Sequence, residues 1–126
     1  MLAFPYGNCD FYDIITENNL YIDRTDRIPL LERTAKSLLF LRPRRFGKSL
    51  LLSVLENYYD IAKAGEFDRL FGHLKIGQNP TKQRNQYLIM RWDFSAIAPE
   101  PTYEAQVQKM TDYVNAEVAA FNEKYR

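Results

Sequence analysis

Residues 42–49 read R-P-R-R-F-G-K-S and fit seven of the eight positions of the phosphate-binding pattern G-x-x-x-x-G-K-[ST]. Arg42 replaces the first glycine. Gly47 lacks a Cβ, so its backbone can approach an anion closely, and a helix beginning at Lys48 adds its positive end at the same place. Lys48 would hold an ammonium over the β- and γ-phosphates, and Ser49 would offer a hydroxyl ligand to Mg²⁺. The spacing therefore predicts a phosphate site.

The loop before Gly47 is strongly cationic. Backbone N–H groups of residues 45–49 are expected to cradle phosphate, which places Arg44, Arg45 and Phe46 among the candidate contacts. The arginines could stabilise phosphate charge, contact a partner subunit, bind nucleic acid, or be a solvated loop without a role. Recognition of nucleic acid uses a basic surface interleaved with aromatic side chains, and Phe46 alone supports it weakly.

The elements around this loop predict an α/β fold. Residues 37–41 (SLLFL) are typical of a strand buried on both faces, and residues 86–94 (QYLIMRWDF) of a second strand. An apolar helix follows Lys48. Alternation of strands and helices favours a P-loop NTPase-like unit with a short parallel sheet flanked by helices. Two strands make a poor sheet, so either residues 20–22 add an edge or the domain is incomplete.

Four further helices are expected. The first spans residues 11–17 behind the capping residue Asp10, the second starts near Thr25 or Asp26 and ends at Arg33, and a short one covers residues 66–74. The last follows Pro101 and carries an apolar stripe at spacings of three and four. That stripe consists of Tyr103, Val107, Met110, Val114, Val118 and Phe121.

The stretch LFLRPRRFGKSLLLSVLENYYD, preceded by YIDRT and followed by FDRLFGHLKIG and RNQYLIMRWDFS, resembles the predicted AAA-ATPase-like family common in bacteria. The resemblance runs from about Tyr6 to Ile97, and the family's own loop reads RPRRFGKS. It implies a P-loop ATPase of the STAND or archaeal-ATPase sort, often followed by a nuclease-like domain of the restriction-endonuclease type. It also implies ATP and Mg²⁺ as cofactors.

Carried over by position, the resemblance assigns Gly47, Lys48 and Ser49 to phosphate and Mg²⁺. It further implies that the YIDRT segment, with Tyr21 and Asp23, lies near the nucleotide and by its base.

Asp93 is the candidate for the second acid of such a site. A P-loop ATPase needs an apolar strand ending in an acid that holds Mg²⁺ and positions water, and Asp93 follows the apolar residues 87–92. Relatives, however, place that strand beyond residue 126, so Asp93 could instead pair with a neighbouring cation. We therefore expect residues 1–126 to form a single domain, the N-terminal portion of a larger ATPase module, with negligible hydrolysis alone.

Composition narrows the class of protein. In 126 residues, 46% are apolar and 26% charged, the balance of a globular domain. Lys and Arg total 17 against 16 acids, so the net charge of +1 gives no field that favours nucleic acid or an acidic membrane. One cysteine excludes an internal disulfide, and neither a membrane span nor a signal peptide is evident. A cytoplasmic location is expected.

Two functions remain open from the sequence. The first is nucleotide binding, with ATP hydrolysis belonging to the complete module. The second is a non-catalytic interaction module, or remnant, that binds a protein or nucleic-acid partner through its arginine-rich loop. The apolar stripe of the final helix additionally predicts self-association or cover by a missing C-terminal half.

Overall fold

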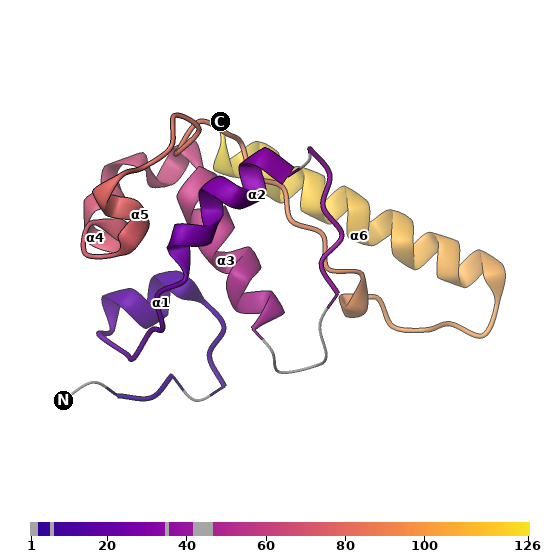
Figure 1. The fold of residues 1–126 in the computed structure, drawn as a ribbon. Coiled ribbons are helices and arrows are strands. Elements are labelled where there is room, and N and C mark those ends of the chain that lie inside the picture. The colour runs from indigo at the N-terminus through magenta and orange to yellow at the C-terminus, as the bar shows by residue number, and fades with distance from the viewer. Residues whose placement is uncertain (1–2, 6, 35, 42–46) are drawn as a thin grey trace. The chain divides into compact units, whose positions relative to one another are not determined.

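The computed structural model describes residues 3–5, 7–34, 36–41 and 47–126, and within them the chain is helical (Figure 1). It divides into two compact units, residues 1–87 and 88–126, called here the N-terminal unit and the C-terminal unit. The N-terminal unit contains α1 (Phe11–Thr16), η1 (Thr25–Arg27), α2 (Ile28–Thr34), α3 (Lys48–Tyr59), η2 (Ile61–Glu66), α4 (Phe67–Phe71) and α5 (Lys75–Gln78). The C-terminal unit contains η3 (Phe94–Ala96) and α6 (Tyr103–Lys124).

Helix α1 starts where the sequence predicts. Asp10 is its N-cap, and the Asp10 carboxylate accepts a hydrogen bond from the backbone N–H of Asp13 at 3.2 Å. The N–H of Phe11 lies in the first turn and has no acceptor within the helix. It donates instead to Ser53 Oγ of α3 at 2.8 Å, a buried bond that fixes α1 against α3.

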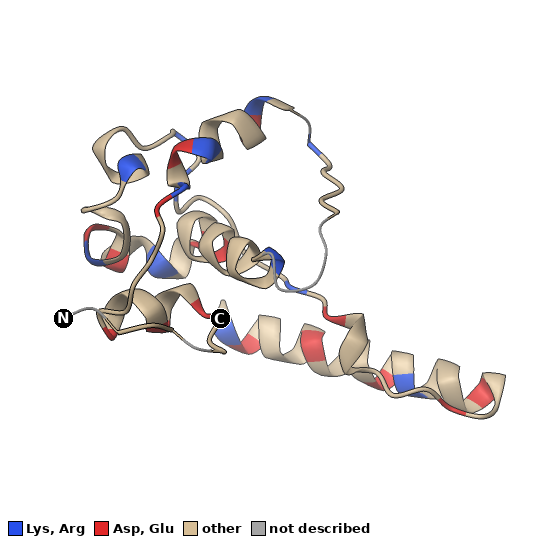
Figure 2. Cartoon of the chain, turned by 60° about the horizontal axis from the view of Figure 1, so that its bottom comes forward, with Lys and Arg blue, Asp and Glu red and all other residues tan. Residues whose placement is uncertain are grey.

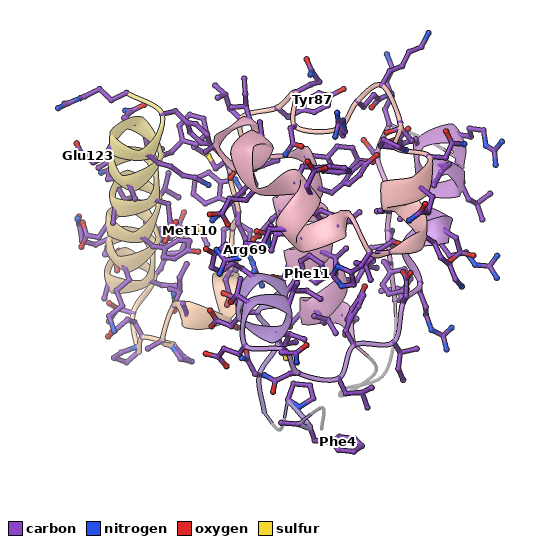
Figure 3. All side chains as sticks on the ribbon, turned by 90° about the vertical axis from the view of Figure 1, so that its left-hand side faces the viewer. Phe4, Phe11, Arg69, Tyr87, Met110 and Glu123 are labelled. Carbon is purple, nitrogen blue, oxygen red and sulfur yellow. The ribbon has the colours of Figure 1, made fainter. Side chains whose placement is uncertain are left out.

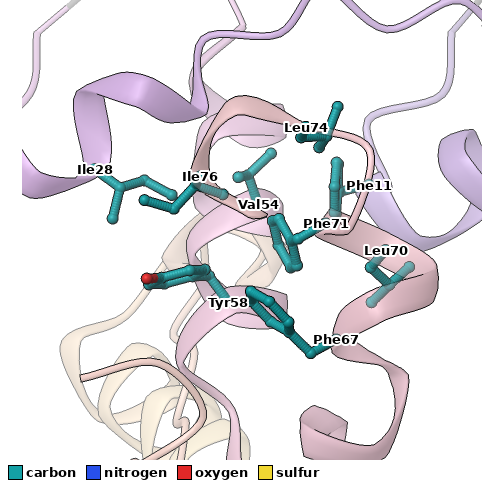
Figure 4. Close-up of a cluster of buried hydrophobic side chains, with 9 residues drawn as sticks. All are labelled: Phe11, Ile28, Val54, Tyr58, Phe67, Leu70, Phe71, Leu74 and Ile76. Carbon is teal, nitrogen blue, oxygen red and sulfur yellow. The ribbon is translucent and has the colours of Figure 1, made fainter. Parts of the chain in front are cut away.

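The core of the N-terminal unit lies where α1, α3 and α4 meet (Figure 4). Phe11 stacks on Phe71 with ring centroids 4.9 Å apart, and Tyr58 meets Phe71 edge-on at 5.5 Å. The helical spacing predicted for residues 66–74 is confirmed, because the apolar side chains of this stretch are all buried. The buried cluster comprises Phe11, Ile28, Val54, Tyr58, Phe67, Leu70, Phe71, Leu74 and Ile76.

The end of α3 is held by the segment that follows α5. Asn85 is buried, and its side-chain amide donates to the carbonyl of Asp60 at 2.8 Å. The backbone of Tyr87 bonds to Tyr59 and Ile61, which gives an isolated parallel bridge between Asp60 and Tyr87. These bonds satisfy backbone groups that the helix end leaves unpaired.

The C-terminal unit pairs one long helix with the extended segment before it. Thr102 caps α6 by accepting from the N–H of Ala105, as the expected helix after Pro101 requires. The backbone N–H of Ile89 donates to the Tyr125 hydroxyl oxygen at 2.8 Å, and that hydroxyl donates to the Ile89 carbonyl at 3.5 Å. The N–H of Asp93 likewise donates to the Tyr113 hydroxyl at 2.7 Å.

The predicted α/β, P-loop NTPase-like fold is wrong for the part of the chain that the structure describes, where there is no strand and no sheet. Residues 38–41 have no regular structure, and Leu39 is 84% exposed. Residues 86–93 form only the bridge at Tyr87, Phe94 begins η3, and residues 20–22 add no edge. An apolar run becomes a strand only when a neighbouring strand takes its backbone hydrogen bonds. Here the helices enclose the apolar core instead.

The helix predictions were more successful. The helices expected at residues 11–17, at 25–33 and from Lys48 onward match α1, η1 with α2, and α3, while the last expected helix is α6. The helix expected over residues 66–74 is shorter than predicted, because α4 ends at Phe71 and a separate helix, α5, begins at Lys75.

Charged residues are spread along the helices of both units (Figure 2). Within the described residues, no helix combines the length and the apolar character that a membrane crossing requires.

Candidate functional site

The first turn of α3 is built to receive an acceptor from outside the helix. Gly47 is its N-cap in the left-handed conformation (φ 81°, ψ 18°), which glycine adopts without the cost that a Cβ imposes. Among the described residues, no side chain caps this helix end. The Gly47 carbonyl accepts from Leu51, but the N–H groups of residues 48–50 have no acceptor within the helix. These donors and the positive end of the helix dipole favour an anion.

A pocket of about 600 Å³ opens beside this helix end, entirely within the N-terminal unit. Gly47 contributes to its wall, and a Cβ built on Gly47 would meet no described atom within 4 Å. Phe4, labelled in Figure 3, belongs to the wall and is 82% exposed. Most of the lining is apolar, with a few polar residues among it. The lining residues are Phe4, Pro5, Asn8, Ile14, Leu20, Tyr21, Ile22, Arg24, Thr25, Arg27, Ile28, Leu31, Phe40, Gly47, Leu50, Leu51 and Val54.

The wall formed by residues 21–27 is fixed by a polar node at Asp23 and Thr25. Asp23 Oδ1 accepts from the N–H of Thr25 at 2.9 Å and from its hydroxyl at 2.6 Å, while Oδ2 accepts from the N–H of Lys75 at 2.7 Å. Thr25 Oγ1 in turn accepts from the N–H of Ile76 at 3.1 Å. Thr25 is only 1% exposed. The node therefore anchors this wall to the first turn of α5.

The same hydrogen bonds shift the acidity of Asp23. Partial burial acts to raise the pKa of Asp23, but the hydrogen bonds from Thr25 and from the Lys75 backbone, together with the Lys75 charge, hold the pKa below its ordinary value. The carboxylate is thus ionised at neutral pH and keeps all its acceptor sites.

Tyr21 lies in the pocket wall against the core. Its ring meets Phe11 edge-on at 5.2 Å. Burial, and secondarily the negative charge of Asp23, raises the pKa of Tyr21 to about 12. Tyr21 is therefore a neutral aromatic surface, suited to a flat apolar group and not to proton transfer near pH 7.

Helix α2, which adds Ile28 and Leu31 to the pocket wall, is anchored through Glu32. Glu32 Oε1 accepts from the Tyr59 hydroxyl at 2.8 Å and from the Thr81 hydroxyl at 2.7 Å. Burial and then the Glu32 carboxylate raise the pKa of Tyr59 far above its ordinary value, so Tyr59 remains a donor. Both ends of the wall formed by η1 and α2 are therefore held by hydrogen bonds.

The sequence-predicted residues occupy three different positions. Arg44, Arg45 and Phe46 lie outside the described residues. Gly47 and Tyr21 line one pocket, and Lys48 and Ser49 are exposed in the first turn of α3 beside it. Asp23 does not line the pocket but supports the backbone that does.

Asp93 belongs to the C-terminal unit and acts there as a cap. Its Oδ1 accepts from the backbone N–H of Ser95 at 3.1 Å and from the Ser95 hydroxyl at 2.5 Å. These hydrogen bonds, with a further contribution from Arg91, hold the pKa of Asp93 below its ordinary value. Metal binding by Asp93 stays a prediction.

One charged residue of the pocket was missed by the sequence argument. Arg27 lines the pocket although that argument assigned it no role. Arg24 entered the prediction only as part of the YIDRT segment. Both belong to the sequence D-R-T-D-R, in which the two arginines are three residues apart. Residues at that spacing share a face of a helical turn, a signal that could have identified the pair.

The described residues contain no group of three or more His, Cys, Asp or Glu side chains arranged to hold a metal ion. Ser49, exposed in the first turn of α3, carries a hydroxyl group of the kind that ligates Mg²⁺ bound to phosphates.

Comparison with known proteins supplies one positive result. Residues 5–126 match the model of a family described as "Predicted AAA-ATPase". Searches of the curated proteins and of the solved structures gave no match.

Proposed function

We propose that this chain, which belongs to the predicted AAA-ATPase family, binds a nucleoside triphosphate with Mg²⁺ in the pocket beside the first turn of α3. The family's description, a predicted AAA-ATPase, suggests an ATPase-like role in nucleotide binding. The observation that carries the proposal is the position of Gly47, which is at once the uncapped N-terminus of α3 and part of the pocket wall.

The phosphates would bind at the first turn of α3. Three backbone N–H groups there lack acceptors within the helix, and the dipole adds positive potential. Lys48 is exposed, and no ion pair engages it among the described residues, so its ammonium is available to the outer phosphates. The Ser49 hydroxyl would ligate Mg²⁺. When bound, Mg²⁺ neutralises part of the triphosphate charge.

The apolar remainder of the pocket suits the base and sugar. A volume of about 600 Å³ lies within the range of pockets that enclose small ligands. Tyr21 provides a neutral ring there, and Leu50 and Val54 on α3 extend the apolar wall away from Gly47. Along α3 the lining therefore runs from the first turn at Gly47 to the apolar side chains of Leu50 and Val54.

ATP is the nucleotide expected from the family, and hydrolysis by this chain alone is expected to be negligible. The candidate acid, Asp93, already accepts two hydrogen bonds from Ser95. Arg44, Arg45 and Phe46 remain predicted phosphate contacts on the evidence of the sequence motif.

Calorimetric titration of the chain with Mg-ATP tests the proposal, together with thermal unfolding. At 100 times its dissociation constant, a ligand that binds only the folded chain raises the unfolding free energy by about 2.7 kcal/mol. Lys48→Ala should weaken Mg-ATP binding by about tenfold or more, the loss of roughly one charge-assisted hydrogen bond. Its unfolding without ligand should match that of the unchanged chain.

Lys82→Ala is the matched control, because Lys82 is also exposed and lies outside the pocket. It should leave Mg-ATP binding unchanged. If Mg-ATP binds to neither the unchanged chain nor Lys82→Ala, nucleotide binding is refuted and the non-catalytic interaction module is favoured.

A further inference from the structure

We infer that Arg24 and Arg27 form a second anion-binding wall of the same pocket and make it selective for ligands with more than one phosphate. This inference rests on the proposed function, and it assigns the arginines a role that the G-K-S motif does not. The ligand would carry a linear polyphosphate group. The first turn of α3 would contact one region of that group, and the two guanidinium groups would contact another.

The pocket lining carries charge of only one sign. Among the described lining residues, Arg24 and Arg27 are charged and no aspartate or glutamate is present. Neither guanidinium has an ion-pair partner among the residues that the structure describes. Two exposed cations on the pocket lining, without an ion pair among the described residues, create a positive potential, which a bound anion relieves. The neighbouring acids do not, because Asp23 bonds to Thr25 and Lys75, and Asp26 pairs with Lys75 at 3.9 Å.

The backbone that carries the arginines is fixed in advance. Arg24 lies between Asp23 and Thr25, whose hydrogen bonds tie this segment to α5, and Arg27 ends η1. Ile28, the next residue, is only 2% exposed and joins the core. Ordering of the backbone on ligand binding is therefore small, and most of the cost is confined to the arginine side chains. Guanidinium groups bind phosphate oxygens in a planar, bidentate manner, which further favours this anion.

Two separate anion-binding parts in one pocket predict selectivity. A single phosphate can be bound by the N–H groups of residues 48–50 alone, whereas a diphosphate or triphosphate has further oxygens that can contact the arginines as well. The arginines should therefore contribute strongly to the affinity for ATP and for inorganic tripolyphosphate, and little to that for AMP.

Titration calorimetry of the full chain with Mg-ATP, AMP and inorganic tripolyphosphate separates these contributions. The double variant Arg24→Gln/Arg27→Gln should lose at least about tenfold in affinity for ATP and tripolyphosphate, and less than about threefold for AMP. Arg33→Gln is the matched control, because Arg33 is exposed on α2 and does not line the pocket. It should bind all three ligands as the unchanged chain does.

Equal losses for AMP and ATP, or no loss for either, would overturn the inference. If the double variant unfolds, Arg24→Lys/Arg27→Lys takes its place, because it keeps the charge without the planar guanidinium group. Its loss of affinity should be smaller, and still greater for ATP and tripolyphosphate than for AMP. Binding of ATP that depends on Lys48 but not on the arginines refutes the inference and leaves the proposed function intact. Arginine-dependent binding of tripolyphosphate without any binding of ATP refutes the proposed function and keeps the role of the arginines. If neither ATP nor tripolyphosphate binds, both the proposed function and the inference are refuted.

Discussion

The two units of this chain bury their side chains very differently. The N-terminal unit encloses a cluster of fully buried aromatic and aliphatic residues, whereas no residue from 88 to 126 is classed as buried. In α6, the apolar stripe that the sequence displays so clearly remains open, with Tyr103 79% and Met110 46% exposed within the described chain. Amphipathic spacing therefore identifies which face of a helix is apolar, but it does not say whether that face is covered.

The difference arises from what each unit places next to its helices. In the N-terminal unit, buried polar side chains of α3, of η1 and of the segment after α5 bond to backbone groups of other elements, as Ser53, Thr25 and Asn85 do. In the C-terminal unit, α6 contacts an extended segment through aromatic rings and tyrosine hydroxyls, including the rings of Trp92 and Tyr113 at 6.2 Å. Packing supplies most helix stability in proteins, so the two units should respond unequally to truncation of side chains.

The largest effect is expected from Phe71→Ala. Phe71 is 0% exposed and contacts the rings of Phe11, Tyr58 and Phe67, so the substitution removes a buried ring and leaves a cavity. The unfolding free energy should fall by about 3–5 kcal/mol in urea titrations followed by circular dichroism. A fall below about 1 kcal/mol would contradict the core described for the N-terminal unit.

An intermediate effect is expected from Asp23→Asn. The amide can replace only part of the carboxylate's acceptor capacity, so the bond from the Lys75 N–H is weakened and the unfolding free energy should fall by about 1–3 kcal/mol near pH 7. Asp68→Asn, at an exposed position of α4, is the control and should change it by less than about 0.5 kcal/mol.

Asp23 also gives this comparison a pH dependence. Its folded-state pKa lies below the unfolded value of about 3.9, so its contribution is present above that pH and is lost as pH falls through the folded pKa. Between neutral pH and about pH 3, the gap in stability between the unchanged chain and Asp23→Asn should narrow. A gap that stays constant over this range would show that the Asp23 charge contributes nothing.

The smallest effect is expected from Phe94→Ala, which is the counterpart of Phe71→Ala in the C-terminal unit. Phe94 is 58% exposed and contacts only the edges or faces of Trp92 and Tyr113 at more than 6 Å between centroids. The unfolding free energy should change by less than about 1 kcal/mol. A loss as large as that of Phe71→Ala would mean that the two units are equally packed.

The helices could be predicted from sequence because their signals are local. Asp10 and Thr102 cap α1 and α6 with their own side chains, and the apolar spacing from Lys48 onward is that of a single helix. The sheet was predicted wrongly for the opposite reason. A strand forms only when another strand, often distant in sequence, takes its backbone hydrogen bonds. The apolar residues of 38–41 and 86–94 do not by themselves indicate whether such a strand lies beside them.

The candidate site could be predicted from the sequence only in part. The sequence predicted that a helix begins at Lys48, as α3 does, because a glycine before a lysine and an apolar helix is a local pattern. The pocket itself depends on segments far apart in sequence. Arg27 contributes to it only because Asp23 and Thr25 join their segment to α5, about 50 residues later, and no local pattern encodes that connection.

The hydrogen bond from the Phe11 N–H to Ser53 Oγ has a consequence for the pocket as a whole. It joins positions 42 residues apart, with Pro5 and Asn8 just before one end and Leu50 and Val54 around the other. This buried bond, together with the packing of α1 on α3, therefore holds two distant stretches of the lining together. Ser53→Ala would retain every described lining residue of the pocket and yet leave the buried N–H of Phe11 without its acceptor, which weakens the attachment of one stretch to the other.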